Sequence, residues 1–195
     1  MFPNSISAEE VNNLPRKSFQ GKIVLITEEA DVAEAVEEIR NHQNVGFDTE
    51  SRPTFRKGQF NHVALLQFAI PNKVFLFRIN LTTLTPELIS LLQDGSIKKL
   101  GIGLHDDLVA LKKQKHFKPA GFVELHTFIS PLGVINTGLR KLTAMILGFR
   151  ISKGQQTSNW ENERLSKAQQ IYAATDAWVC LQMYDKLKDL DVVRE

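Results

Sequence analysis

Apolar and polar residues follow one another along the chain in two patterns, one typical of strands and one typical of helices. Short apolar runs predict strands over 22–27, 45–50, 63–70, 74–79 and 98–102. Apolar positions and end signals predict helices over 32–39, 86–92, 106–115 and 137–147, and a long final helix that follows Ser166. We interpret 1–20, which is polar and mixed, as an irregular lead-in, and 21–195 as a single domain.

Residues at the predicted helix ends support these assignments. Asp31 with Glu34, and Ser166 with Gln169, have the spacing of a capping box, in which two side chains satisfy free backbone N–H groups. Thr85 precedes a proline, and this order is typical of the first turn of a helix. The sequence therefore predicts where three of the helices begin.

The order of the elements predicts the architecture. Pro71-Asn72 is a turn signal between two apolar runs, so 63–70 and 74–79 are expected to form a hairpin. Later strands alternate with helices, which favours parallel pairing. We therefore expect an α/β domain in which a mixed central β-sheet carries helices on both faces.

Composition excludes several classes of protein. Apolar residues make up 43% and charged residues 24% of the 195 residues, and the net charge is +2, as in an ordinary globular domain. Cys180 is the sole cysteine, so an internal disulfide is excluded and a reducing, cytoplasmic location is expected. We see neither a signal peptide nor a run of about 18 apolar residues, and we expect no membrane association.

An acidic pair lies at the end of one predicted strand, in the run Asp48-Thr49-Glu50. Side chains two apart on a strand point to the same face, and acidic residues are poor strand formers. The pair is either the solvated end of an edge strand or a site for divalent cations, which carboxylates can bridge.

Asp106-Asp107 is a second acidic pair, at the start of a predicted helix. It follows Gly101-x-Gly103, but the third glycine of a dinucleotide-binding loop is missing, because Asp106 occupies its place. We therefore set nucleotide binding aside. An aspartate at a helix start can simply be a cap, so a cap and a metal ligand both remain open here.

Tyr172 and Asp176 lie four residues apart in the final helix, so both project from one face. The tyrosine is either a packing residue or a group whose hydroxyl reaches a water or a phosphate. If this helix meets the first acidic pair and one aspartate of the second, four carboxylates surround one point and require cations to stay ionised. Sites with two divalent metals cleave phosphodiesters.

Basic residues flank the acidic motifs in sequence. Three groups are present: Arg52, Arg56 and Lys57; Lys112, Lys113, Lys115 and Lys118; and Arg140, Lys141, Arg150 and Lys153. Each group can be a solvated face, but together they suit a phosphate track that leads to a negative centre. The histidines lack metal-ligand spacing, and only His105 adjoins an acidic pair.

Taken together, these motifs resemble the 3′–5′ exonucleases of the four-carboxylate type with a catalytic tyrosine, a family that includes ribonuclease D. The first family motif is matched by Asp48 and Glu50, and the third by Tyr172 and Asp176. The second is matched by Asp107, which is preferred over Asp106 because Leu111 follows four residues later. The resemblance covers roughly residues 20 to 190 and implies a ribonuclease H-like fold.

The resemblance also implies a mechanism. Asp48, Glu50, Asp107 and Asp176 would hold two divalent ions, Mg²⁺ or Mn²⁺, and Tyr172 would orient the attacking water. The candidate substrate contacts are Thr49, His105 and Leu111.

The implied activity is hydrolysis of the terminal phosphodiester at a 3′ end, with release of 5′-mononucleotides. The expected partner is single-stranded or 3′-overhang DNA or RNA; the sequence does not distinguish the two sugars and does not define an oligomeric state. The alternative is a catalytically silent module of the same fold that binds nucleic acid or a protein.

Overall fold

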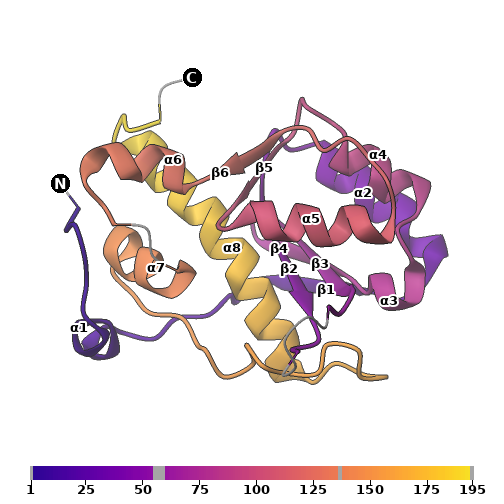
Figure 1. Cartoon of the computed structure of the whole chain (residues 1–195), viewed down its shortest axis with the longest axis horizontal. Coiled ribbons are helices and arrows are strands. Elements are labelled where there is room, and N and C mark those ends of the chain that lie inside the picture. Colours follow the sequence, from indigo (N-terminus) through magenta and orange to yellow (C-terminus); the bar gives the residue numbers. More distant parts are fainter. Residues whose placement is uncertain (1, 55–59, 136–137, 194–195) are drawn as a thin grey trace.

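The computed structural model describes residues 2–54, 60–135 and 138–193 (Figure 1). Its centre is a six-stranded sheet with the order β1-β4-β3-β2-β5-β6. The strands are β1 (Lys22–Ile26), β2 (Asn44–Ser51), β3 (Val63–Ile70), β4 (Lys73–Phe77), β5 (Lys98–Gly101) and β6 (Phe122–Glu124). β3 pairs antiparallel with β2 and β4, and the remaining neighbours pair in parallel. The sheet is therefore mixed, as predicted.

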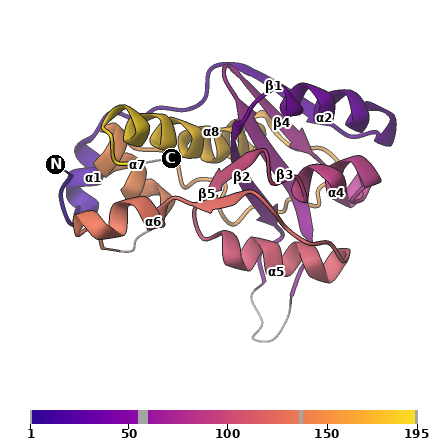
Figure 2. The same ribbon diagram turned by 90° about the horizontal axis from the view of Figure 1, so that it is seen from above.

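Helices cover both faces of the sheet (Figure 2). They are α1 (Ala8–Asn13), α2 (Val32–Arg40), α3 (Ile79–Thr82), α4 (Pro86–Leu92), α5 (Leu104–Gln114), α6 (His126–Ile129), α7 (Leu139–Leu147) and α8 (Lys167–Asp189), with 3₁₀ turns at Glu29–Asp31 and Ser130–Leu132. α2, α4 and α5 pack on one face and α8 on the other, while α6 and α7 pack beside α8. The predicted α/β architecture is confirmed.

The alternating side chains of β3 supply both cores. All its residues are buried. Leu66 and Phe68 belong to the core on the side of α2, α4 and α5, where the rings of Phe68 and Phe47 lie 5.2 Å apart. Leu65 and Ala69 belong to the core under α8. A strand that is apolar on both faces belongs in the interior of a sheet, which explains its near-continuous apolar run.

Gly46 on β2 lets α8 approach the sheet. A Cβ atom at this position would lie 2.0 Å from the carbonyl oxygen of Ala177. The facing side of α8 is built from small buried residues, including Ala173 and Ala174. This close approach brings the middle of α8, where Asp176 lies, onto the same strand that carries the first acidic motif.

We expect Gly46→Ala to destabilise the fold by about 1–3 kcal/mol, because the added methyl group meets backbone rather than a flexible side chain. Urea denaturation measures the change. Gly95→Ala is the matched control, because this exposed glycine lies outside the helices and strands and a Cβ there meets only the Ala120 Cβ, at an ordinary 3.7 Å. Its effect should stay within about 0.5 kcal/mol. Equal losses in the two variants would contradict the close-approach argument.

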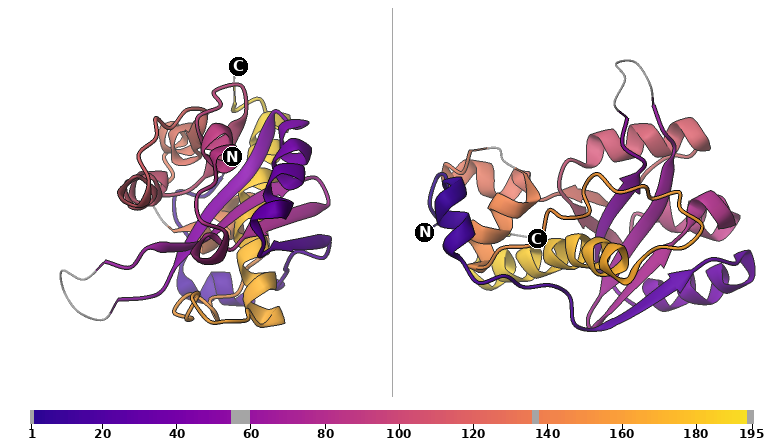
Figure 3. Two further views of the ribbon diagram at one scale, coloured as in Figure 1. Left: turned by 90° about the vertical axis from the view of Figure 1, so that its right-hand side faces the viewer. Right: turned by 90° about the horizontal axis from the view of Figure 1, so that it is seen from below.

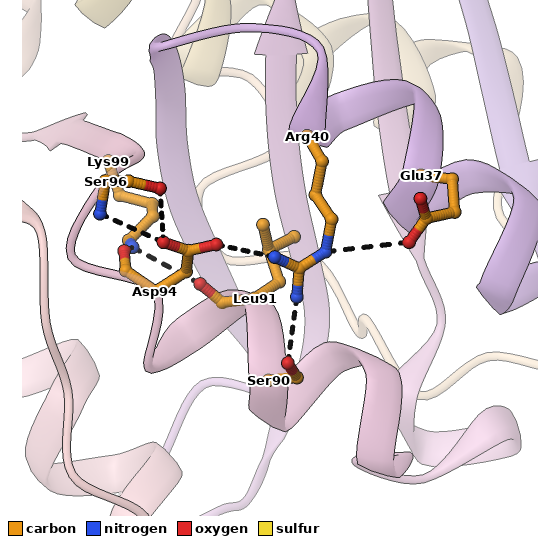
Figure 4. Close-up of polar contacts among 7 residues, drawn as sticks. All are labelled: Glu37, Arg40, Ser90, Leu91, Asp94, Ser96 and Lys99. Carbon is orange, nitrogen blue, oxygen red and sulfur yellow. Dashed lines mark hydrogen bonds and ion pairs between the residues drawn. The ribbon is translucent and has the colours of Figure 1, made fainter.

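A polar network ties the start of β5 to two helices (Figure 4). The Arg40 guanidinium donates to Asp94 at 2.5 Å and to Ser90 at 2.9 Å. Lys99 is fully buried and donates to the carbonyl oxygens of Leu91 at 3.2 Å and Asp94 at 2.5 Å. Burial lowers the pKa of Lys99 to about 8. The network fixes β5, the strand that leads directly into α5.

Several predicted details were wrong. Residues 8–13 form α1 rather than an irregular segment, because Ser7 and Glu10 make a capping box and Val11 is buried. Asp31 makes no side-chain cap, since it ends a 3₁₀ turn in helical conformation. The caps at Thr85 and Ser166 are confirmed.

The predicted boundaries differ by a few residues at some places. The strand predicted over 74–79 ends at Phe77, where α3 soon follows. The helix predicted over 106–115 begins at Leu104. The helix predicted over 137–147 begins at Leu139, and position 137 lies outside the described residues. β6 and α6 were not predicted, because each has at most four residues and no strong periodicity.

Candidate active site

β2 and α8 bring three carboxylates together. Asp48 and Glu50 project from the face of β2 that α8 covers, and Asp176 projects from the middle of α8. One carboxylate oxygen from each lies within 4.8 Å of the others, a spacing that could hold a metal ion. The predicted meeting of the first and third motifs is therefore present in the structure.

Asp107 approaches this cluster from the first turn of α5. Its Oδ1 accepts a hydrogen bond of 2.5 Å from the Thr49 hydroxyl, which lies between Asp48 and Glu50 on β2. Its negative charge contributes to raising the pKa of both of those carboxyl groups, although its oxygens lie outside the group of three. The half-buried Asp107 therefore lies near the three carboxylates, bonded to the side chain that β2 presents between Asp48 and Glu50.

The start of α5 is fixed by a residue of β6. Both Gly103 and Leu104 donate their backbone N–H groups to Glu124 Oε2, at 2.7 and 3.1 Å. Gly103 has a φ of 74°, a conformation that favours glycine. This capping sets the rotation of the first turn, which leaves Asp106 exposed and turns Asp107 towards β2.

Tyr172 lies one helical turn before Asp176 and is buried against Trp160, with ring centroids 6.0 Å apart. Burial, followed by the charges of Asp176 and Glu50, raises the pKa of its phenol above the ordinary value of 10.0. At neutral pH the hydroxyl therefore keeps its proton. It can donate a hydrogen bond beside the carboxylates, but it is not a base.

Burial raises the pKa values of all four carboxyl groups. The pKa of Asp48 lies well above 3.8, and the pKa of Glu50 rises to about 10, with the neighbouring carboxylates as further causes. The pKa of Asp176 rises to about 8. The pKa of Asp107 rises to about 6, held down by the hydrogen bond from Thr49. A divalent cation would reverse these shifts by favouring the ionised forms.

The residues fit such a cation. The donors are all carboxylate oxygens, which hard divalent cations prefer. Asp176 Oδ1 is buried and has no hydrogen-bond partner among the described residues, and a bound cation would satisfy it.

We expect the metal-free protein to lose stability as the pH rises from about 5 to 9. At these pH values the native state keeps carboxyl protons that the unfolded chain, with its ordinary pKa values, has released. Stability is therefore greatest near the low end and falls by up to about 1.4 kcal/mol per pH unit for each carboxyl group that is still protonated in the native state, until the pH passes the native pKa of that group. Thermal melts in EDTA measure this slope. Asp176→Asn should flatten it, and a wild-type slope of the opposite sign would contradict the electrostatic argument.

The acid cluster opens into a cleft of about 540 Å³. Asp48, Glu50 and Asp176 line its acidic end, and its walls include three cationic residues: Arg140, Lys141 and Lys153. Part of the predicted basic group thus lies in the same cleft as the carboxylates. A second cleft of about 470 Å³ shares Tyr172 and Asp176 with the first.

The other predicted basic residues have different surroundings. Arg150 donates its Nε–H to the carbonyl oxygen of Leu14, and Lys115 donates to that of Leu84. The Arg52 guanidinium lies 3.5 Å from a carboxylate oxygen of Glu161. Lys112 and Lys113 are exposed on α5, and Lys118 is exposed just beyond its end. Outside the described residues lie Arg56 and Lys57.

Two of the three residues predicted to contact the substrate, Leu111 and Thr49, have other partners in the structure. Leu111 is fully buried in the core with Phe47. It lies one turn after Asp107 on the same face of α5, so the rotation that brings Asp107 to the edge of the sheet packs Leu111 against the sheet. That prediction was wrong. The Thr49 hydroxyl is engaged by Asp107. His105 is exposed and lines neither cleft, so its role stays a prediction.

Sequence reasoning missed two polar residues beside the site. Glu124, which caps α5, lies on a three-residue strand that gave no signal. Gln67 is fully buried on β3, directly opposite Asp48 in the antiparallel pair, and within the described part of the chain both of its side-chain polar atoms lack hydrogen-bond partners. The sequence signal for Gln67 was a single amide side chain within the otherwise apolar run of β3.

Residues 23–190 match the model of a protein family described as 3'-5' exonuclease. The chain belongs to this 3'-5' exonuclease family. It is 35% identical over 189 residues to the bifunctional 3'-5' exonuclease/ATP-dependent helicase WRN of Mus musculus, covering 92% of the chain and 14% of that protein. A 3'-5' exonuclease of Arabidopsis thaliana is 33% identical over 152 residues, covering 75% of the chain and 53% of that protein. The chain thus spans about half of one relative and a small part of the other.

Solved structures of the family share the fold. The Nibbler EXO domain of Aedes aegypti superposes with a TM-score of 0.79 at 21% identity, covering 89% of this chain and 94% of that one. Trypanosoma brucei RNase D in complex with RNA U12 gives 0.78 at 23% identity, covering 87% and 63%. The ribonuclease H-like fold of this exonuclease domain is therefore confirmed. Among the described residues, no helix has the length and apolar character to span a membrane.

Proposed function

We propose that this exonuclease domain hydrolyses terminal phosphodiesters at the 3′ end of single-stranded or 3′-overhang nucleic acid and releases 5′-mononucleotides. The observation that carries the proposal is the meeting of Asp48, Glu50 and Asp176 in a cleft with cationic walls. The carboxylates need cations, and the cationic side chains of the cleft attract phosphates. Both features suit the same substrate, a nucleic acid strand.

Asp48, Glu50, Asp107 and Asp176 are the residues that would hold two divalent ions, Mg²⁺ or Mn²⁺. Bound ions would supply an activated water and charge stabilisation at the leaving oxygen. The protein holds its carboxylates ready for this role through the backbone of β2, the close approach of α8 at Gly46, and the hydrogen bond from Thr49 to Asp107.

Tyr172 supplies a neutral hydroxyl next to Asp176. Because burial and the acidic neighbours raise its pKa, the phenol stays protonated and orients a water rather than deprotonating it. Packing against Trp160 fixes the ring, so the hydroxyl remains at one place beside the carboxylates. Arg140, Lys141 and Lys153 would bind the phosphates of the strand.

The test is product analysis with oligonucleotides labelled at the 5′ end, which show the shortened strands, and in parallel reactions on the 3′-terminal nucleotide, which show the released product. Wild type should shorten single-stranded DNA or RNA from the 3′ end in Mg²⁺ or Mn²⁺, leave it intact in EDTA, and release 5′-mononucleotides. A circular single strand is the control, since an exonuclease requires an end. Comparison of DNA with RNA, and of blunt with recessed ends, defines the substrate. Binding without any release under these conditions would instead support the catalytically silent alternative.

A further inference from the structure

The N-terminal segment contributes to the cleft, although the family match begins only at residue 23. Ala8 and Val11, one turn apart on α1, line the same cleft as the acid cluster. α1 lies beside α7 in Figures 1 and 2 and in the right-hand view of Figure 3, and Asn12 of α1 is hydrogen-bonded to Arg140 of α7. The sequence alone gave this segment no role.

Backbone hydrogen bonds attach this segment to the rest of the domain. Arg150 donates its backbone N–H to the carbonyl oxygen of Pro15, and Lys17 donates to that of Arg150, both at 3.0 Å. The buried N–H of Phe19 donates to the Thr175 hydroxyl at 3.0 Å, one residue before Asp176 on α8. The wall that α1 provides is therefore fixed relative to the carboxylates.

α1 also holds one of the cations of the cleft. Asn12 Oδ1 accepts a hydrogen bond of 2.6 Å from Nη2 of Arg140, the cleft residue on α7. This contact anchors the guanidinium while Arg140 lines the cleft. Guanidinium groups bind phosphates through parallel hydrogen bonds, so an anchored guanidinium in the cleft wall suits a phosphate.

We propose that α1 is one wall of the groove along which a single-stranded nucleic acid reaches the acid cluster. In this arrangement Ala8 lies against the sugar–phosphate backbone, and Asn12 holds Arg140 towards a phosphate. The occupant follows from charge, because the cleft that α1 lines also carries Arg140, Lys141 and Lys153. This inference rests on the proposed function and extends it to a segment outside the family match.

A pair of opposite charges at Ala8 tests the wall. The side chain is exposed, so Ala8→Glu and Ala8→Lys should both fold, with at most a small loss of melting temperature for Ala8→Lys, which puts a positive charge in the first turn of α1. In fluorescence anisotropy with a labelled ten-nucleotide single strand, Ala8→Glu should weaken binding roughly threefold to tenfold and Ala8→Lys should strengthen it. The slope of log affinity against log salt should become steeper by up to about 1 for Ala8→Lys.

Glu9→Lys is the matched control, because Glu9 is exposed on the same turn but does not line the cleft. It changes the net charge by more than Ala8→Lys, yet it should strengthen binding less. If Glu9→Lys had the larger effect, long-range charge would explain the result and the wall would be excluded.

Asn12→Ala tests the anchor of Arg140. It should raise the KM for the strand and leave kcat unchanged, and Asn13→Ala, on the same helix, should change neither. Asn12→Ala should add little to Arg140→Ala, since the two changes remove one interaction. Additive effects would overturn the anchor. Anisotropy in EDTA measures the wall without catalysis, so an inactive wild type would contradict the proposed function while these binding differences still test the inference.

Gln67 is a buried polar residue beside the acid cluster that plays no part in the groove wall. Its side chain is fully buried on the α8 face of β3, with Leu65 and Ala69 of that core on either side, and Asp48 directly opposite on β2. Opposed side chains in an antiparallel pair have Cβ atoms about 4.5–5.5 Å apart, within reach of a carboxamide. Buried amides without partners are rare and call for an explanation. We infer that Gln67 is a positioning residue whose amide group donates to the Asp48 carboxyl group and holds it in place at the site.

Gln67→Leu separates this role from packing. Loss of an unpartnered buried amide should leave the metal-free melting temperature unchanged or higher. The rise in melting temperature with Mn²⁺ should shrink, and the Mn²⁺ concentration needed for half of that rise should increase roughly tenfold. Leu65→Met, a change of similar volume on the same face, should leave the Mn²⁺ response unaltered. Equal Mn²⁺ responses in wild type and Gln67→Leu would overturn the inference, and this readout does not depend on nuclease activity.

Discussion

Asp107→Asn should reduce turnover at least about 100-fold, whereas Asp106→Asn should keep most of it. The two side chains are adjacent in sequence, but consecutive helical residues point about 100° apart. The structure gives Asp107 a half-buried position and a 2.5 Å hydrogen bond from Thr49, and it leaves Asp106 exposed. Steady-state hydrolysis of a labelled strand in saturating Mn²⁺ measures both variants.

Stability controls keep this comparison interpretable. Asp106→Asn removes a favourable charge from the first turn of α5, at a cost of about 0.3–1 kcal/mol, and Asp107→Asn removes buried negative charge next to the other carboxylates. Both variants should therefore remain folded at 25 °C. Thr49→Val should show part of the Asp107→Asn defect, since it removes the donor that holds the carboxylate. An inactive Asp106→Asn beside an active Asp107→Asn would reverse the assignment.

Tyr172→Phe should lower kcat by about 100-fold and leave the KM and the melting temperature nearly unchanged. Only the hydroxyl is removed, so the ring keeps its contact with Trp160. The proton of this phenol is retained through the neutral range, because burial and the carboxylates raise its pKa. The pH profiles of kcat in wild type and in Tyr172→Phe should accordingly have the same shape through the neutral range, because the phenol does not ionise there.

Tyr184→Phe is the matched control. Tyr184 is buried on the same helix, and its hydroxyl accepts a hydrogen bond from Lys98 at 3.3 Å, away from the acid cluster. Its loss should cost stability without a specific loss of kcat. Similar turnover in Tyr172→Phe and wild type would show that Tyr172 is a packing residue.

Local sequence determined much of this fold. The limits of β3 coincide with its apolar run, and the capping boxes or cap residues at Thr85 and Ser166 begin α4 and α8 as predicted. Strand alternation placed Asp48 and Glu50 on one face, and helical spacing did the same for Tyr172 and Asp176. These features depend on residues within a few positions of one another, so a pattern along the chain is sufficient to reveal them.

Only the tertiary structure decided how these motifs meet. The approach of α8 to β2 depends on a missing side chain at Gly46 and on the alanines opposite, and the rotation of α5 depends on Glu124 from a strand too short to predict. The same rotation buries Leu111 in the core. The position of α1 in the cleft wall arises from hydrogen bonds to residues more than 100 positions away. Such contacts join distant segments, and no pattern within one segment encodes them.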